Sequence, residues 1–370
     1  MQTIKKLTLV ISSLTGGGAE GICVNIANSF ADNGWEVDLV VLNLNDEVYV
    51  DRISKKVNLV VLKSNHVRFS FIPLIKYLYK KKIKTILVFN HELTVMLVIL
   101  RFLLGLNIKI ISRNISVLSI KINQFEKNFF WQRFVVKNLI KFFYQKLDHV
   151  VNQCHSMRDD LIKVFPQLIN KSNVIYNPIS IHIQDYIRKN DLTKIQKKNY
   201  LLCVGRLEQV KAFHHAIEGF AGIASKFPEL RLKIVGKGSL EKKLKKKAFE
   251  CSVIDRVDFE GFQKNIIPYY LYAKGTILTS SYEGYPNVLL ESISMNTPVI
   301  AFDCPGGTHE IIQNGLNGYL VNNQNIDDLK EKLSILLLNK LNYEDLKKTV
   351  KKNQIENVIK NYEKLIISFL

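Results

Sequence analysis

Short apolar runs alternate with longer amphipathic stretches along most of this chain. Apolar runs of about four to eight residues are typical of buried strands, and apolar positions that recur every three or four residues are typical of helices. The strands predicted in the first half are residues 7–12, 36–43, 57–62, 83–89, 108–112, 149–152 and 173–176. Those predicted in the second half are residues 201–204, 230–235, 257–259, 276–279 and 299–302. Because helical stretches separate the strands, the pattern predicts parallel sheets covered by helices.

The alternation stops in a polar, charged segment near residues 182–198. A chain of 370 residues is too long for one ordinary domain and suits two, each with its own core. We therefore predict an N-terminal Rossmann-like domain over residues 1–180, a linker over 181–198 and a C-terminal Rossmann-like domain over 199–353. Residues 354–370 carry apolar side chains at helical spacing and are predicted to form a last helix with an apolar face.

The clearest local signals lie in residues 275–303, where two apolar runs enclose a loop and a helix. Pro286 is tolerated in the first turn of a helix but not in its interior, and Asn287 is a good cap, so the helix should begin there. Glu283 then lies in the preceding loop and Glu291 about one turn inside the helix. A helix N-terminus favours an anion such as a diphosphate. We predict a sugar-nucleotide site, against the alternative of an ordinary turn with two solvated acids.

Basic residues follow the first predicted strand of the second half. Gly205, Arg206 and Lys211 come after residues 201–204. Ligands of doubly wound folds bind at the carboxyl ends of the strands, where a guanidinium and an ammonium can clamp a leaving diphosphate. The alternative is a solvated loop with two basic residues.

A motif in residues 283–291 resembles that of the retaining glycosyltransferases of family 4: Glu283, Gly284, Pro286, Leu290 and Glu291. That family has the GT-B fold, in which two Rossmann-like domains face each other across a cleft and a C-terminal helix crosses back to the N-terminal domain. The resemblance implies that Glu283 lies beside the transferred sugar and Glu291 binds the ribose hydroxyls. It also implies that Arg206 and Lys211 hold the phosphates, although Ala212 stands where Gly is usual.

The resemblance extends to further residues around the donor. Gly236 and Gly238 follow a strand and let the backbone approach a ligand. Phe262 would lie at the edge that binds the base, although a structural turn explains residues 260–262 nearly as well. Glu283, Arg206 and Lys211 are the predicted catalytic residues. The predicted donor site comprises Gly17, Gly18, Gly205, Arg206, Lys211, Gly236, Gly238, Phe262, Glu283, Gly284, Tyr285, Pro286, Asn287 and Glu291.

The glycine-rich loop after the first strand has two interpretations. Gly16, Gly18 and Gly21 fit the dinucleotide-binding pattern, which supports an alternative as an NAD-binding enzyme. That pattern requires an acid at the end of the second strand, where this chain has Asn43 and Asn45, with Asp46 just beyond. Residues 17–20 instead resemble the Gly-Gly-Ala-Glu loop of family 4, which faces the cleft.

Three polar residues follow strands of the first half and are predicted to point toward the acceptor: His91, Arg113 and Asn114. Many relatives have a histidine where this chain has residues 112–114. We therefore expect Arg113 to contact an anionic group rather than to act in catalysis. His91 also fits the role of an ordinary polar loop residue.

The chain is strongly basic, with a net charge of +19 and a pI near 9.5, which favours an anionic partner. One cationic run contains Lys76, Lys80, Lys81, Lys82 and Lys84. A helical stretch over residues 121–146 combines cations with aromatic residues around more than one face, namely Lys127, Arg133, Lys137, Lys141, Phe125, Phe129, Phe130, Trp131, Phe134, Phe142, Phe143 and Tyr144. An interfacial helix on an anionic membrane explains both kinds of residue. A packed surface helix remains an alternative, and nucleic-acid binding ranks last because no known module is present.

No metal site is expected, because the Asp-x-Asp pair of other glycosyltransferases is absent and Asp159 and Asp160 are adjacent. Arg206, Lys211 and helix amides must then balance the diphosphate, so the resemblance implies a metal-independent enzyme. Five scattered cysteines indicate a reducing compartment. The longest apolar stretch, residues 93–106, is shorter than the roughly 20 residues of a membrane span.

These features together predict a cytoplasmic glycosyltransferase at the inner face of the cytoplasmic membrane. It would move a sugar, with retention, from a nucleotide-diphosphate sugar to a lipid-linked glycan of bacterial surface polysaccharide, such as O-antigen, capsule or lipopolysaccharide. The favoured donor is a UDP-sugar. A soluble acceptor is the first alternative, and the NAD-binding enzyme is the second.

Overall fold

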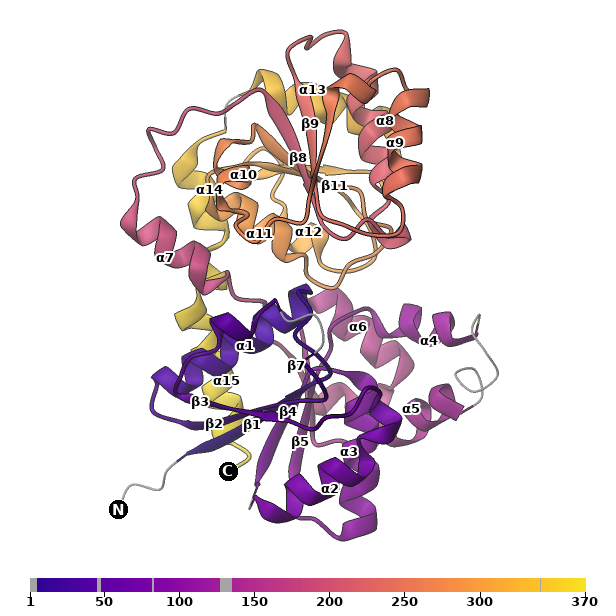
Figure 1. The fold of residues 1–370 in the computed structure, drawn as a ribbon, viewed down its shortest axis with the longest axis vertical. Coiled ribbons are helices and arrows are strands. Elements are labelled where there is room, and N and C mark those ends of the chain that lie inside the picture. The colour runs from indigo at the N-terminus through magenta and orange to yellow at the C-terminus, as the bar shows by residue number, and fades with distance from the viewer. Residues whose placement is uncertain (1–4, 45–47, 82, 127–134, 340) are drawn as a thin grey trace. The chain divides into compact units, whose positions relative to one another are not determined.

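The computed structural model describes residues 5–44, 48–81, 83–126, 135–339 and 341–370. The chain divides into two compact units, Met1–Ser180 with Ile355–Leu370, and Ile181–Gln354. Each unit is built on a parallel sheet flanked by helices (Figure 1). The two sheets confirm the pair of Rossmann-like α/β domains that the alternating pattern predicts.

The sheet of the first unit has seven strands in the order β3-β2-β1-β4-β5-β6-β7. Its strands are β1 (Lys6–Ile11), β2 (Glu36–Val41), β3 (Val57–Val61), β4 (Thr85–Val88), β5 (Lys109–Arg113), β6 (His149–Asn152) and β7 (Ser172–Val174). The strand order reverses between β1 and β4, which pair in parallel. In doubly wound folds this reversal opens a crevice at the carboxyl edge of the sheet.

Helices cover the sheet of the first unit. They are α1 (Gly18–Asp32), α2 (Phe71–Lys80), α3 (His91–Leu104), α4 (Leu118–Glu126), α5 (Lys137–Phe143), α6 (His155–Val164) and α15 (Ile355–Ile367). Helices α2, α3 and α5 share one core cluster with strand residues, whereas α1 packs against α15 (Figure 1). Asn90 caps α3 by accepting from the amides of Glu92 and Leu93, and Gly105 ends it with a φ of 59°.

The sheet of the second unit has six strands in the order β10-β9-β8-β11-β12-β13. They are β8 (Tyr200–Val204), β9 (Arg231–Val235), β10 (Val257–Gly261), β11 (Gly275–Leu278), β12 (Val299–Phe302) and β13 (Gly318–Val321). The helices are α7 (Ile181–Lys189), α8 (Phe213–Ala224), α9 (Glu241–Glu250), α10 (Ile267–Tyr272), α11 (Asn287–Ser294), α12 (Thr308–Ile311), α13 (Ile326–Leu338) and α14 (Tyr343–Thr349). Strand order reverses between β8 and β11.

Two segments differ from the sequence-based expectation. The polar segment treated as a linker begins with helix α7, whose Ile183 is buried. The stretch over residues 121–146 contains the end of α4, then α5 and a short 3-10 helix, Tyr144–Lys146. Its members Lys127, Phe129, Phe130, Trp131, Arg133 and Phe134 lie outside the described residues. Among the helices that the structure describes, none is long and apolar enough to cross a membrane.

The last helix contributes to the core of the first unit. Val358, Ile359, Tyr362 and Ile366 of α15 are buried, as their helical spacing predicts. Glu363 of α15 lies outside this apolar stripe and accepts a hydrogen bond from the indole Nε1–H of Trp35 at 3.1 Å. The apolar face predicted for residues 354–370 is therefore covered by elements of the N-terminal half of the chain.

Candidate functional site

The predicted catalytic residues lie in loops that follow strands β8 and β11 of the second unit. Arg206 and Lys211 follow β8, and Glu283 follows β11, which pairs with β8 in parallel. Carboxyl ends of parallel strands share one edge of a sheet, so these loops meet there. Arg206 is exposed, whereas Lys211 and Glu283 are mostly covered.

Lys211 and Glu283 form an ion pair at this edge. The Lys211 Nζ donates to Glu283 Oε1 at 2.5 Å, and the two side chains are only 17% and 13% exposed. The hydroxyl of Ser280 donates to the same carboxylate oxygen at 2.6 Å. Sequence reasoning missed Ser280, although its place three residues before Glu283 at the end of a strand was a usable signal. The site therefore joins a cation, an acid and a buried hydroxyl.

Backbone contacts hold the two loops together. Ser281 donates its amide to the Val210 carbonyl at 2.8 Å. The Thr279 hydroxyl donates to the carbonyl of Ala212 at 3.1 Å. Ala212, which departs from the family pattern, has a φ of 44°. The left-handed backbone of this residue explains the usual glycine, because a side chain there is strained by about 1 kcal/mol.

Glycines allow a third loop to approach Glu283. Glu283 donates its amide to the Pro305 carbonyl at 2.9 Å, and Gly307 donates to the Gly284 carbonyl at 2.8 Å. Gly306, between these bonds, has a φ of 124°, and a Cβ there would lie 1.9 Å from the Glu283 carbonyl oxygen. Gly306 was not among the predicted site residues. Its lack of a side chain is required by the backbone that carries Glu283.

The two predicted glycines after β9 touch the loop that carries Arg206. A Cβ at Gly236 would lie 1.8 Å from the Gly205 carbonyl oxygen, and one at Gly238 would lie 2.5 Å from that of Leu207. Glycine is therefore required at both positions because a side chain would collide with the backbone of this loop. Phe262, predicted for the base, is about half exposed, with the Lys237 ammonium 5.8 Å from its ring centroid.

Helix α11 begins where Pro286 and Asn287 predict, with Pro286 in extended conformation at its N-cap. Glu291 lies on this helix and accepts a hydrogen bond from the Tyr270 hydroxyl at 3.1 Å. Tyr285 is buried, and its hydroxyl accepts from the Asn353 amide at 3.4 Å. Tyr270 and Asn353 are neighbours that local sequence did not reveal, because they come from other elements of the unit.

In the first unit, Gly17 and Gly18 lie where β1 leads into α1, as the glycine loop predicts. A Cβ at Gly17 would lie 2.3 Å from the Glu20 carboxylate, so this side chain folds back over the loop. The acid required by the NAD-binding alternative is not provided by Asn43, whose amide donates to the Ser64 carbonyl at 3.1 Å. Asn45 and Asp46 lie outside the described residues.

His91, Arg113 and Asn114 are brought close to one another but are buried. The hydroxyl of Tyr144 lies 3.3 Å from His91 Nδ1 and donates to Asn114 Oδ1 at 2.5 Å. Burial lowers the pKa of His91 to about 4, so the imidazole is neutral at pH 7. Their predicted role toward the acceptor stays a prediction.

The guanidinium of Arg113 binds its own unit. Its Nε donates to the Tyr362 hydroxyl of α15 at 2.6 Å, and its Nη2 donates to Asn177 Oδ1. The side chain is fully buried, and Nη1 has no hydrogen-bond partner among the described residues. We expected Arg113 to contact an anionic group, and the groups that it contacts here are a phenol and an amide.

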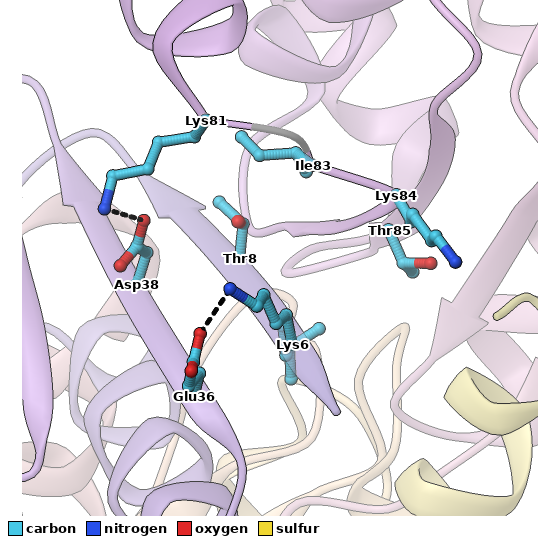
Figure 2. A pocket seen from close by; sticks show the side chains of 9 residues that line it. Lys6, Thr8, Glu36, Asp38, Lys81, Ile83, Lys84 and Thr85 are labelled. Carbon is cyan, nitrogen blue, oxygen red and sulfur yellow. Dashed lines mark ion pairs between the residues drawn. The ribbon is translucent and has the colours of Figure 1, made fainter. Parts of the chain in front are cut away.

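A separate pocket lies at the opposite, amino edge of the first sheet, lined by the starts of β1, β2 and β4 (Figure 2). Its acids are paired: Lys6 with Glu36 at 2.6 Å, and Lys81 with Asp38 at 3.8 Å. Asp38 also accepts from the Tyr77 hydroxyl at 2.7 Å. These two ion pairs link neighbouring elements at the amino edge of the sheet, and the pocket contains none of the predicted site residues.

No group of three or more His, Cys, Asp or Glu side chains suited to a metal occurs in the described part of the chain. The groups that contact Glu283 are the Lys211 ammonium, the Ser280 hydroxyl and the backbone of Pro305 and Gly306. Such a set can bind a phosphate and a polyhydroxyl compound, as a transferase acting on nucleotide sugars requires.

Comparison with known proteins identifies this class. The family model "Glycosyltransferase Family 4" matches residues 16–182, and "Glycosyl transferases group 1" matches residues 186–353. The chain belongs to these glycosyltransferases of the GT-B type, and it is an enzyme that transfers glycosyl groups.

Relatives of similar length agree with this assignment. An uncharacterized glycosyltransferase of Haemophilus influenzae is 26% identical over 91% of each chain. A Campylobacter jejuni N-acetylgalactosamine-N,N'-diacetylbacillosaminyl-diphospho-undecaprenol 4-alpha-N-acetylgalactosaminyltransferase is 24% identical over 99% of this chain and 98% of its own. The structure of Anabaena HepE with UDP-glucose has a TM-score of 0.78 at 17% identity, covering 98% of this chain and 99% of that one, and shares the fold.

Proposed function

We propose that this enzyme transfers a sugar, with retention of anomeric configuration, from a nucleotide-diphosphate sugar to an acceptor hydroxyl. The observation that carries the proposal is the Lys211–Glu283 ion pair at the carboxyl edge of the second sheet, with Arg206 in the loop that carries Lys211. The two cations would stabilise the negative charge that grows on the leaving diphosphate. Glu283 would accept a hydrogen bond from the sugar, and Glu291 would bind the ribose.

We propose retention because the motif of residues 283–291 resembles that of family 4, and the 4-alpha-transferase name of the Campylobacter relative supports this proposal. In the proposed step, the bond between the anomeric carbon and the diphosphate oxygen breaks. The acceptor oxygen forms its bond to that carbon on the same face, and its proton passes to the leaving phosphate. No side-chain nucleophile is required. Because Arg206 and Lys211 balance the diphosphate, we propose that no metal ion is needed.

UDP is the proposed nucleotide, since the similar fold of Anabaena HepE was solved with UDP-glucose. A glycan carried on a lipid diphosphate is the proposed acceptor, since the name of the Campylobacter relative contains diphospho-undecaprenol. Such acceptors belong to bacterial surface polysaccharide assembly. Three buried residues stay candidates for the acceptor side, namely His91, Arg113 and Asn114. They would act by supporting the loops that contact the acceptor.

Thermal unfolding with UDP, GDP, ADP and NAD tests the donor site. One nucleoside diphosphate should raise the melting temperature of the wild type. At a hundred times its Kd, a ligand stabilises the native state by about 2.7 kcal/mol. The shift should be unchanged by EDTA and absent from Arg206→Ala and Glu291→Ala. A shift by NAD alone, or mutants that respond like the wild type, would refute the site.

We further propose that the first unit docks on an anionic membrane through a basic aromatic face, defined as Phe102, Leu103, Lys141, Phe142 and Lys146. Phe102 and Leu103 lie in the last turn of helix α3, which packs against α5, the helix that carries Phe142. Each of these three side chains is more than half exposed. The Lys146 ammonium lies 5.3 Å from the Phe142 ring centroid and 6.0 Å from that of Phe102.

Charge favours a lipid headgroup as the occupant of this face. Helix α5 contains no acidic residue, and the nearby Asp148 is already paired with Arg101 and Lys109. Helix α2 adds an exposed Ile72 and Tyr79 with Lys76 and Lys80. Aromatic rings can enter the headgroup region while lysines contact anionic lipid.

Replacing Phe102 and Phe142 by serine and Lys141 by glutamate should weaken binding to vesicles containing anionic lipid by at least about tenfold, since each basic residue contributes about 1 kcal/mol. Co-sedimentation measures the change. The matched control is Phe249→Ser on α9, where the ring is 71% exposed but Lys245 and Lys246 pair with Glu241 and Glu250. Equal binding by all variants, or no binding by the wild type, would favour a soluble acceptor.

A further inference from the structure

Glu283 and Lys211 form an ion pair at the place where the donor is proposed to bind. A single oxygen, Glu283 Oε1, receives both the Lys211 ammonium and the Ser280 hydroxyl. Both charged side chains are largely shielded from water, so neither is easily satisfied by solvent. Any diphosphate that takes Lys211 therefore removes the cation from Glu283.

We infer that Glu283 competes with the nucleoside diphosphate for Lys211 and thereby promotes release of that product after transfer. This inference rests on the proposed function and concerns the same site. It assigns Glu283 a second role, beyond contact with the sugar, in setting which ligand the site retains. No covalent bond changes in this step, because the ammonium only exchanges one anionic partner for another.

The intact donor compensates both members of the pair. Its phosphate binds the Lys211 ammonium, and a sugar hydroxyl can donate to the Glu283 carboxylate in place of the ammonium. After transfer the sugar has left with the acceptor, and the carboxylate faces the product phosphates. Like charges in a partly buried site repel, and the ion pair can form again when the product leaves. The nucleoside diphosphate should thus bind more weakly than its sugar conjugate.

The loops keep Glu283 in this position. The Pro305 carbonyl accepts from its amide, and Gly306 lies against its carbonyl. Ser281 links the same loop to Val210, next to Lys211. The carboxylate is therefore held beside the lysine while the flexible lysine side chain can turn. A Cβ at Gly205 would come within 3.3 Å of Lys211 Cε, so glycine at this position leaves space for that movement.

Calorimetric titration with the nucleoside diphosphate that stabilises the wild type tests the competition. Glu283→Gln keeps the shape and removes the charge, so it should bind that diphosphate about fivefold more tightly, the scale of one partly screened ion pair. It should bind the intact nucleotide sugar more weakly, and product inhibition should become stronger. Asp258→Asn is the control, because this acid of the same unit also pairs with cations, Arg231 and Lys233, and should leave binding unchanged.

A double-mutant cycle separates competition from simple repulsion. In the Lys211→Met background, Glu283→Gln should tighten diphosphate binding by less than it does when lysine is present. Equal tightening in both backgrounds, or none with lysine present, would overturn the inference while leaving the donor site intact. Failure of the wild type to bind any of UDP, GDP and ADP would instead refute the proposed function. Thermal melting of each variant confirms that it is folded.

Discussion

Lys211→Ala and Arg206→Ala should each lower kcat by about 100- to 1000-fold, the usual cost of removing one group that stabilises transition-state charge. The diphosphate gains negative charge as its bond to the sugar breaks, so a fixed cation stabilises the transition state more than the bound donor. Lys211 is held by Glu283 and by the 3-10 helix Gln209–Lys211, whereas Arg206 is exposed. We expect the larger loss for Lys211→Ala.

Steady-state kinetics with a radiolabelled donor measures these losses. Lys245→Ala is the matched control, because this lysine of the same unit pairs with Glu241 on α9 at 2.7 Å and should change kcat less than twofold, as expected for an exposed pair. A change confined to KM would mean that Lys211 contributes only uniform binding. Wild-type rates in both variants would remove these cations from the mechanism.

Gly306→Ala should lower activity by about 100-fold, since a misplacement of roughly 1 Å at a reacting group can have that effect. The added Cβ would meet the Glu283 carbonyl oxygen at 1.9 Å, so the loop that holds Glu283 must move. The positive φ of 124° adds strain of about 1 to 3 kcal/mol. Activity assays with a thermal melt should therefore show lost turnover and reduced stability together.

Gly315→Ala separates the two effects of this substitution. Gly315 also has a positive φ, 78°, but a Cβ there would meet nothing within 4 Å. This variant should lose stability through strain and keep most of its activity. Equal losses of activity in both variants would show that the contact between Gly306 and Glu283 has no special role.

Local interactions explain why much of the fold could be predicted. Each strand and helix must bury an apolar face, so the spacing of apolar residues indicates which element a segment forms. The start of α11 depends on Pro286 and Asn287 alone, and the structure begins the helix at Asn287. Helix α7 was missed because only a few of its residues, such as Ile183, are buried on a polar segment.

Contacts between distant residues explain what could not be predicted. Glu283 and Lys211 are 72 positions apart, and no local pattern indicates that they pair. The need for glycine at 306 comes from the backbone of another loop, and the left-handed φ of Ala212 could not be inferred from an alanine. Arg113 is predicted to contact an anionic group because it lies at the carboxyl end of a strand, but the fold buries it against Tyr362, 249 positions away.

The sequence by itself determined the two parallel sheets, the helix start at the donor motif and the residue types offered at the carboxyl ends of the strands. These follow from periodicity and from backbone restrictions that act within a few residues. Only the tertiary structure decided which side chains meet, which glycines are sterically required and which charges are buried. Such properties arise when segments far apart in the chain share one core, where close packing and loss of water fix a single set of partners.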